Sequence, residues 1–228
     1  MDSDMRTLFQ SYGFDLSVEQ EKAFDIYFDM LVDWNKKMNL TGIEDEKDVY
    51  VKHFLDSLML GRKLDVTNCS LLDVGSGAGF PGIPLKIVFP SLKLTIIDAL
   101  KKRITFLEAL TSALEIDAEL IHGRIEEHGQ KEAYDIVTAR AVASLNMLGE
   151  FCIPFVKKGG HFIAYKSYRY KDELDTAKDA LDLLGAKLSN LWDFTIDGHF
   201  RTLLVFEKNK ETPRKYPRAF NKIKSKPL

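Results

Sequence analysis

The apolar positions of the chain follow one period before residue 70 and a different one after it. Over residues 17–37 they recur every three or four residues, as on one face of a helix, and Ser17 with Gln20 forms a capping box at its start. A shorter helix is expected over 46–61, with Gly61 in the position that follows its last turn. The first part of the chain is therefore predicted to be a small helical unit without strands.

After residue 70 the apolar residues gather in short, nearly continuous runs that are typical of buried strands. Helical stretches separate the first five runs, most clearly at 101–116, and another at 170–185 follows the fifth. Only a turn at Asp197-Gly198 separates the last two runs, so we expect them to pair antiparallel. The predicted strands are 70–75, 92–99, 118–123, 134–141, 160–166, 187–196 and 201–208.

This alternation of strands and helices predicts an α/β fold, a mostly parallel sheet covered by helices on both faces. Ordinary dinucleotide-binding domains have six parallel strands. Seven strands with an antiparallel last strand resemble instead the Rossmann-like sheet of the common class I methyltransferase domain. We expect a helical cap over 1–65, this α/β domain over 66–209 and a basic tail over 210–228.

Composition narrows the possible classes of protein. The 228 residues are 45% hydrophobic, with no apolar run near the length of a membrane span, and the acidic start lacks the features of a signal peptide. Cys69 and Cys152 are too few for a disulfide framework and lack the spacing of metal ligands. We therefore expect a cytoplasmic protein without a membrane partner or a metal site, and nothing requires more than a monomer.

Charge is distributed unevenly along the chain. Residues 1–60 hold six Lys or Arg and thirteen Asp or Glu, whereas residues 208–228 hold eight Lys or Arg and a single acid, Glu211. A basic tail with Tyr216 and Phe220 among its cations is suited to RNA phosphates and base stacking. A frayed, solubilising terminus explains the same composition equally well.

A glycine-rich loop, DVGSGAGFPG, follows the first predicted strand over 73–82. Gly75, Gly77 and Gly79 let its backbone turn sharply and approach a ligand closely. A dinucleotide-binding loop requires glycine at the position of Phe80. The spacing resembles instead the S-adenosylmethionine loop of class I methyltransferases.

An acidic residue, Asp98, ends the second predicted strand, 23 residues after Gly75. A carboxylate in this position accepts hydrogen bonds from ribose hydroxyls. The loop, the acidic strand end and the seven-strand pattern together indicate a cofactor site at the carboxyl edge of the sheet. The alternative is a tight structural turn that binds no ligand.

Over about residues 30–170 the chain resembles a known family, the bacterial small-subunit ribosomal RNA guanine-N7 methyltransferase G family, also called glucose-inhibited division protein B. The resemblance rests on Trp34-Asn35, Asn39-Leu40-Thr41, His53 to Ser57, residues 73–85, Asp98 with Lys101-Lys102-Arg103 and Phe106-Leu107, Gly123 to Glu126, Tyr134-Asp135, Thr138 to Ala141 and Lys166. The chain departs from the family at Ala99, where Ser is usual. Its tail keeps Tyr216-Pro217-Arg218 but lacks a glycine and a further proline that relatives often carry.

This resemblance implies S-adenosyl-L-methionine as cofactor, S-adenosyl-L-homocysteine as product, and small-subunit ribosomal RNA or the small ribosomal subunit as partner. It implies that Arg140 faces the methyl group and the incoming base. The implied cofactor-binding residues are Gly75, Gly77, Gly79, Phe80, Asp98, Ala99, Ile125, Glu126 and Arg140. The residues that we expect to contact RNA are Asn39, His53, Lys101, Arg103, Arg201 and Arg218.

The chemistry of guanine N7 limits what the enzyme has to supply. N7 has an exposed lone pair and no proton, so its methylation needs no general base. Holding N7, the methyl carbon and the sulfonium sulfur in line supplies up to about 7–11 kcal/mol of the barrier. We therefore expect no catalytic His or Cys, and we predict that Arg140 and Lys166 place the RNA.

Structural interpretations and other functions stay open beside this one. In the structural interpretation, His53 and Asp56, one helical turn apart, bond each other and dock the cap. Phe80 then serves packing alone, and Glu126 either caps a helix or pairs with Arg124. The other functions are methyl transfer to a small molecule or protein, cofactor binding without catalysis, and a nicotinamide-dependent dehydrogenase, which Phe80 disfavours.

Overall fold

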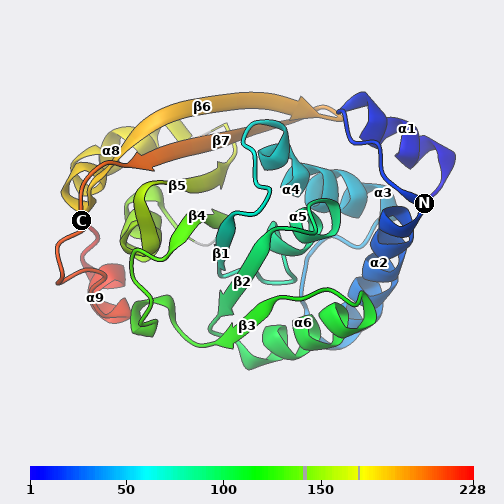
Figure 1. Ribbon diagram of the computed structural model, residues 1–228, viewed down its shortest axis with the longest axis horizontal. Coiled ribbons are helices and arrows are strands. Elements are labelled where there is room, and N and C mark those ends of the chain that lie inside the picture. Colours follow the sequence, from blue (N-terminus) through cyan, green and yellow to red (C-terminus); the bar gives the residue numbers. More distant parts are fainter. Residues whose placement is uncertain (141–142, 169) are drawn as a thin grey trace.

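The computed structural model describes residues 1–140, 143–168 and 170–228, arranged as a seven-stranded sheet with helices on both faces (Figure 1). The strands are β1 (Ser70–Val74), β2 (Lys93–Asp98), β3 (Glu119–His122), β4 (Tyr134–Arg140), β5 (Val156–Lys166), β6 (Ala186–Ile196) and β7 (His199–Lys208). The α-helices of the described residues are α1 (Ser3–Ser11), α2 (Val18–Met38), α3 (Glu46–Val49), α4 (Asp56–Leu58), α5 (Gly82–Val88), α6 (Lys101–Ala113), α7 (Leu145–Cys152), α8 (Tyr170–Leu184) and α9 (Phe220–Ser225).

The strands lie in the order β3-β2-β1-β4-β5-β7-β6, with β1 to β5 parallel and β7 antiparallel to both β5 and β6. The predicted α/β class and the closing hairpin are confirmed. Asp197 and Gly198 form its turn with φ angles of 45° and 80°, which a tight two-residue hairpin requires. Ala141, the last residue of the predicted fourth strand, lies outside the described residues.

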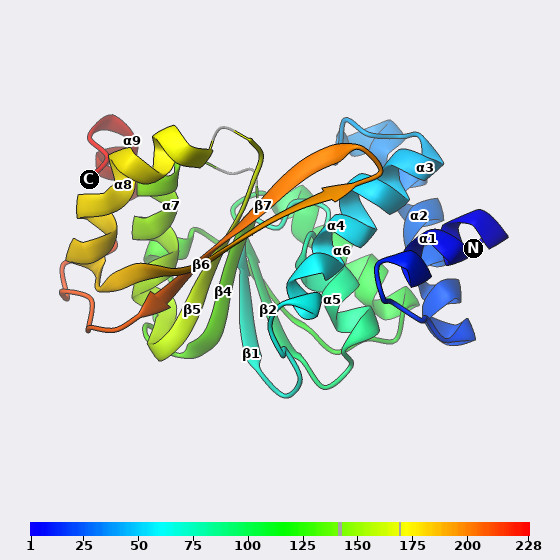
Figure 2. The ribbon, with the colours of Figure 1, turned by 90° about the horizontal axis from the view of Figure 1, so that it is seen from above.

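Successive side chains of the central strands enter two different cores. Leu71 packs in the core beneath α5, α6 and the N-terminal helices, and Leu72 packs in the core beneath α7, α8 and α9. Ile96 and Ile97 are divided in the same way. Figure 2 shows α7, α8 and α9 on one side of the sheet and α4, α5 and α6 on the other. Burial on both faces explains why these strands are apolar at nearly every position.

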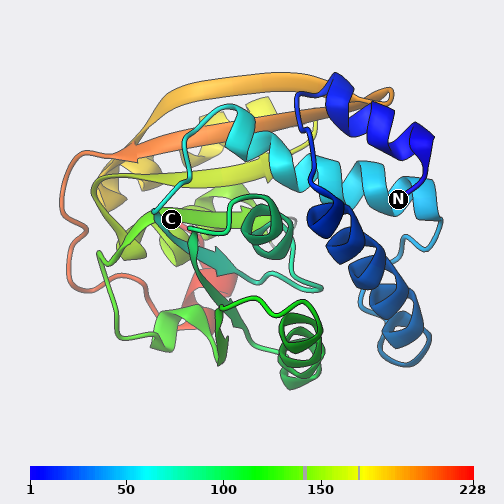
Figure 3. The same cartoon turned by 45° about the vertical axis from the view of Figure 1, so that its right-hand side comes forward.

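The N-terminal helices cover the end of the molecule next to α5 and α6 (Figure 3). Ser17 caps α2 as predicted: its hydroxyl accepts a hydrogen bond from the backbone N–H of Gln20, whose side chain accepts one from the N–H of Ser17. None of the helices in the described ranges is long and apolar enough to cross a membrane.

The predicted helix 46–61 is a continuous but irregular helical segment. After α3 it first widens into a π-helical stretch at Tyr50–Leu55, and after α4 it tightens into a 3₁₀ turn at Met59–Arg62. The prediction for Gly61 was wrong, because Gly61 lies inside the 3₁₀ turn and Lys63 caps it. A Cβ at Gly61 would lie 2.4 Å from a ring carbon of Phe89, so close packing requires the glycine.

The C-terminal tail packs against α7 and is not frayed. Tyr216 is 4% exposed and Ile223 of α9 is fully buried. The guanidinium of Arg218 donates one hydrogen bond to each carboxylate oxygen of Glu150, at 2.7 and 2.6 Å. The alternative of a frayed terminus is therefore excluded, since apolar side chains of the tail complete the core on this face.

Candidate active site

The glycine-rich loop joins β1 to α5 at the carboxyl edge of the sheet, and a buried carboxylate holds its two ends together. Asp73 accepts a hydrogen bond from the backbone N–H of Gly82 at 2.9 Å and another from the Thr138 hydroxyl at 3.2 Å. Burial raises the pKa of Asp73 to about 6, although these hydrogen bonds favour its charged form. The loop is thus fixed to β1 and β4 before any ligand binds.

An aromatic stack joins this loop to the N-terminal helices. The ring of Phe80 lies between Tyr27 of α2 and His53, with centroid distances of 5.4 and 4.5 Å. The Tyr27 hydroxyl also donates to the carbonyl of Ala78 at 2.5 Å. Tyr27 belongs to the predicted helix over 17–37, and the apolar periodicity of that helix gives no signal that this residue supports the loop.

Asp98 lies at the end of β2 beside the loop, as predicted. Its Oδ2 accepts hydrogen bonds from the backbone N–H of Gly77 and the guanidinium of Arg103, each at 3.1 Å, and its Oδ1 accepts one from Leu100 N–H at 2.9 Å. Arg103, expected to contact RNA, is therefore directed toward the predicted ribose site. The side chain of Arg103 is 32% exposed, whereas that of Asp98 is 2% exposed.

A small, mainly apolar cavity of about 110 Å³ follows β1, β2 and β3 at the same edge. It brings together four of the predicted cofactor-binding residues, Gly75, Ala99, Ile125 and Glu126. The other lining residues are Val74, Ile97, Gly123, Arg124, Leu148, Phe151 and Phe220. Leu148 and Phe151 of α7 and Phe220 of the tail were not predicted, because nothing in the local sequence connects them with the strand ends.

Arg140 is the centre of a hydrogen-bond network at the end of β4. Its Nη1 donates to Asp56 Oδ2 at 3.1 Å and to the carbonyl of Lys52 at 3.3 Å, and its Nη2 donates to His53 Nδ1 at 3.1 Å. The guanidinium carbon lies 4.9 Å from the centroid of the Phe80 ring. His53 and Asp56 thus share Arg140 as a partner, and this contact docks the N-terminal helices on the sheet.

The hydrogen bonds of His53 determine its protonation state. Arginine has no acceptor, so His53 Nδ1 accepts from Arg140 and Nε2–H donates to the Thr41 hydroxyl at 2.8 Å. Burial, together with the charge of Arg140, lowers the pKa of His53 to about 3. The imidazole is therefore neutral at physiological pH and does not act as an acid there.

A second cation faces Asp56 from the opposite oxygen. The Nε of Arg201, on β7, lies 3.2 Å from Asp56 Oδ1. Burial raises the pKa of Asp56 above its ordinary value, and the two guanidiniums act in the opposite direction. One buried carboxylate therefore serves two arginines, which leaves a net positive charge at this point.

These groups surround a cavity of about 390 Å³ in which cations outnumber acids. Its lining residues are Ile43, Lys52, His53, Asp56, Arg140, Tyr165, Lys166, Ser167 and Arg201. The glycine-rich loop contacts both cavities, since Gly75 lines the smaller one and Phe80 stacks against His53 of the larger one. Phe80, a predicted cofactor-binding residue, lines neither cavity and is 4% exposed.

Four predicted site residues have other partners or lie apart. Lys166 lines the larger cavity, but its ammonium group donates to Glu173 at 2.6 Å and to the carbonyl of Ala143 at 3.1 Å. Lys101 is exposed and pairs with Glu108, Arg218 is held by Glu150, and Asn39 is exposed at the end of α2. Their predicted contacts with RNA stay predictions.

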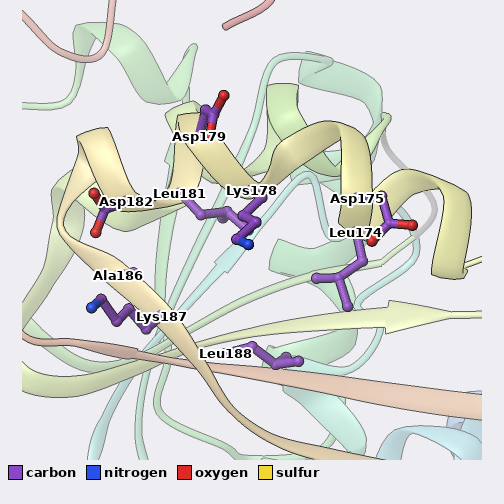
Figure 4. A pocket seen from close by; sticks show the side chains of 9 residues that line it. All are labelled: Leu174, Asp175, Lys178, Asp179, Leu181, Asp182, Ala186, Lys187 and Leu188. Carbon is purple, nitrogen blue, oxygen red and sulfur yellow. The ribbon is translucent and has the colours of Figure 1, made fainter.

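A larger hollow, of about 560 Å³, lies between α8 and β6 (Figure 4). Leu174, Leu181 and Leu188 give it an apolar floor, and acidic and basic side chains of α8 and β6 surround it. It shares no lining residue with either cavity at the strand ends and includes no predicted site residue.

Known proteins identify the family. Residues 20–200 match the family described as rRNA small subunit methyltransferase G. A "Ribosomal RNA small subunit methyltransferase G" of Staphylococcus saprophyticus is 47% identical over 225 residues, which cover 96% of this chain and 94% of the relative. One of the same description from Listeria welshimeri is 49% identical over 221 residues, covering 93% of each chain. The chain belongs to this family.

Solved structures of proteins with low sequence identity to this chain share its fold. A methyltransferase from Pyrococcus furiosus superimposes with a TM-score of 0.59 at 13% identity, over 82% of this chain and 98% of the other. TrmN from Thermus thermophilus gives a TM-score of 0.54 at 16% identity, over 68% and 48% of the two chains. Fold and family together favour the methyltransferase interpretation over a dehydrogenase, and the resemblance noted in the sequence is confirmed.

Proposed function

We propose that this protein transfers a methyl group from S-adenosyl-L-methionine to N7 of a guanine in small-subunit ribosomal RNA. The observation that carries the proposal is the cation-lined cavity around Arg140, which lies against Phe80 of the glycine-rich loop. Ribosomal RNA is a polyanion, so a cavity with Lys52, Arg140 and Arg201 at its wall favours it over a neutral substrate. Membership of the methyltransferase G family supports the same substrate.

The residues around the loop fit the cofactor. A Cβ added at Gly77 or at Gly123 would meet no atom within 4 Å, so the backbone borders open space at both points. Asp98 stands beside Gly77 as the acceptor for ribose hydroxyls, and Ala99, Ile125 and Glu126 line the cavity for the base. When bound there, the cofactor supplies an electrophilic methyl group.

The chain's own task is then to position the guanine, because N7 has no proton to lose. Arg140 has its geometry fixed by Asp56, His53 and the carbonyl of Lys52, so its guanidinium is held rigidly at the wall of the cavity. A planar, charged donor in this place hydrogen-bonds the guanine edge or a flanking phosphate. Orientation of this kind is the chief source of acceleration for such a transfer.

Further contacts with the RNA surround this centre. Arg201 and Lys52 line the same cavity and are suited to phosphates next to the target base. Lys101 and Asn39 are exposed and extend the polar surface. Lys166 acts through Glu173, which also accepts a hydrogen bond from Leu145 N–H at the start of α7. Lys166 is therefore a positioning residue.

The same proposal covers the setting of the reaction. The substrate is small-subunit ribosomal RNA, free or in the small ribosomal subunit, and the place of action is the cytoplasm. The protein works as a monomer. Residues 1–65 form a cap that buttresses the loop, 66–209 form the catalytic domain, and 210–228 form a tail attached to it.

Transfer of labelled methyl from S-adenosyl-L-methionine tests the proposal. The acceptors are small-subunit ribosomal RNA and small subunits, both from cells that lack this gene, with large-subunit RNA as the matched control. Primer extension after chemical cleavage at 7-methylguanine locates the label. We expect one labelled guanine in the small-subunit RNA.

Absence of label in both acceptors, with cofactor binding intact, would overturn the proposed substrate. Equal label in large-subunit RNA would overturn the specificity. A difference between free RNA and subunits would show whether the cation-lined cavity needs the folded particle to receive its base.

A further inference from the structure

Phe220 brings the C-terminal tail to the predicted adenine site. It lines the small cavity together with Ala99 and Ile125, which follow β2 and β3. Its ring stacks with Phe151 of α7, with centroids 6.1 Å apart and planes at 20°. The guanidinium of Arg124 lies 4.2 Å from the centroid of the same ring. A residue near the end of the chain therefore forms a wall at the carboxyl edge of the sheet.

The tail is anchored on both sides of Phe220. Arg218 binds the fully buried Glu150 through its side chain and through its backbone N–H, the latter at 2.9 Å. Ile223 is fully buried in the core beneath α7 and α8. Because contacts before and after Phe220 fix the backbone, its ring is held in place without a ligand.

The size and the chemistry of the cavity indicate what it holds. About 110 Å³ lies below the roughly 300 Å³ of a pocket that encloses a whole drug-sized ligand, so the cavity suits a single ring system. Its walls are mainly apolar and aromatic, and Asp98 stands at the end of β2, next to Ala99. This pairing of an aromatic slot with a ribose acceptor is the chemistry of a nucleoside.

We propose that Phe220 is a cofactor-binding residue, and that the tail forms the wall against which the adenine ring of S-adenosyl-L-methionine packs. This inference rests on the proposed function. It assigns the basic tail to the cofactor site, where the sequence suggested only RNA binding or disorder. Arg124, which contacts Phe220 and lines the cavity, keeps the ring oriented toward the slot.

Binding measured by calorimetry tests the inference without any turnover. The ligands are S-adenosyl-L-homocysteine and 5′-methylthioadenosine, which share the adenosine part and differ in the amino acid. Phe220→Ala is expected to raise the dissociation constant of both by about tenfold, the worth of one aromatic stack on a base. Phe220→Tyr is expected to bind like the wild type. Lys224→Ala, an exposed position on the same helix, is the matched control and leaves binding unchanged.

A second variant keeps the test decisive if Phe220→Ala loosens the tail and lowers the melting temperature. Phe220→Trp places a fluorophore in the wall, and we expect its emission to change on addition of 5′-methylthioadenosine, relative to the wild type with its two native tryptophans. Unchanged affinity in Phe220→Ala, or unchanged emission in Phe220→Trp, overturns the inference alone. A wild-type protein that binds neither ligand overturns the proposed cofactor as well.

Discussion

Arg140 at the end of β4 donates a hydrogen bond to Asp56 at 3.1 Å, across 84 residues of sequence. Asp56 belongs to the irregular helical segment of the N-terminal part, and its other oxygen faces Arg201 of β7. One carboxylate therefore joins the N-terminal helices, the parallel sheet and the closing hairpin. Because Arg140 also contacts Phe80, this junction connects the glycine-rich loop to the cation-lined cavity.

Removal of this carboxylate is expected to destabilise the protein strongly. Asp56→Ala leaves Arg140, whose side chain is 14% exposed, without its partner, and breaking such a largely buried pair costs about 3–5 kcal/mol. Asp48→Ala is the matched control, since Asp48 pairs with Lys52 on the surface of the same segment, where a pair contributes under about 1 kcal/mol. Urea unfolding measures both. Similar losses in the two variants would show that Asp56 is not the junction.

Substitution of Arg140 by lysine is expected to reduce turnover and to spare cofactor affinity. A lysine keeps the charge, but its single ammonium cannot hold the fork that contacts Asp56, His53 and Lys52 together. Loss of that orientation costs about a hundredfold in the rate of methyl transfer. Single-turnover transfer to ribosomal RNA and calorimetry with S-adenosyl-L-homocysteine separate the two effects. Near-normal turnover of Arg140→Lys or Arg140→Ala would remove Arg140 from this role.

His53 is expected to make folding less favourable as pH falls. Its pKa is about 3 in the folded protein against an ordinary value of 6.5, so below pH 6.5 the unfolded chain takes up a proton that the folded chain refuses. The stability that neutral His53 provides is complete above pH 6.5 and declines toward pH 3. Urea unfolding of wild type and His53→Gln at pH 7 and pH 5 measures it, and parallel curves for the two proteins would contradict it.

Asp73 is expected to make folding more favourable as pH falls, the opposite of His53, and it therefore serves as the control. Its pKa of about 6 exceeds the ordinary 3.8, so between these values the folded protein holds a proton that the unfolded chain has released. This contribution is complete below pH 3.8 and is lost as pH rises through 6. Asp73→Asn is therefore expected to remove a gain in stability on acidification, whereas His53→Gln removes a loss.

Two glycines of the loop are expected to respond differently to alanine. At Gly79, φ is 104° and a Cβ would lie 2.7 Å from the Tyr27 hydroxyl and 2.8 Å from Ile83, so Gly79→Ala loses about 1–3 kcal/mol of stability to overpacking, besides backbone strain. At Gly77, φ is 65° and a Cβ would meet no atom within 4 Å. Gly77→Ala is therefore expected to lose only about 1 kcal/mol of stability, from backbone strain.

Gly77→Ala, the variant with the smaller loss of stability, is expected to have the larger loss of cofactor affinity. The methyl group that Gly77→Ala adds projects into open space, at a residue whose N–H bonds Asp98. Gly77→Ala is therefore expected to weaken binding of S-adenosyl-L-homocysteine more than its small loss of stability explains. Thermal unfolding with and without this ligand measures both quantities. Full ligand stabilisation of Gly77→Ala would show that the cofactor does not pass this side of the loop.

Local patterns in the sequence determined the strands, the main helices and the position of the glycine-rich loop. These patterns are apolar runs, turn residues such as Asp197-Gly198 and the cap at Ser17. Each depends on residues only a few positions apart, so it can be recognised without the tertiary structure. The carboxyl ends of neighbouring parallel strands lie at one edge of the sheet, and Gly75, Ala99 and Ile125 accordingly line one cavity there. The 3₁₀ turn at Gly61 was not predicted, because it depends on packing against Phe89, 28 residues away in sequence.

Tertiary structure alone decided which side chains contact one another across the fold. Four features join distant segments: the partners of Arg140, the pairing of Lys166 with Glu173, the support of the loop by Tyr27, and the place of Phe220 in the small cavity. Periodicity shows that a residue faces inward, but it does not show what it meets there. Each contact depends on the docking of several elements at once, and the free energy that selects it comes from their combined packing.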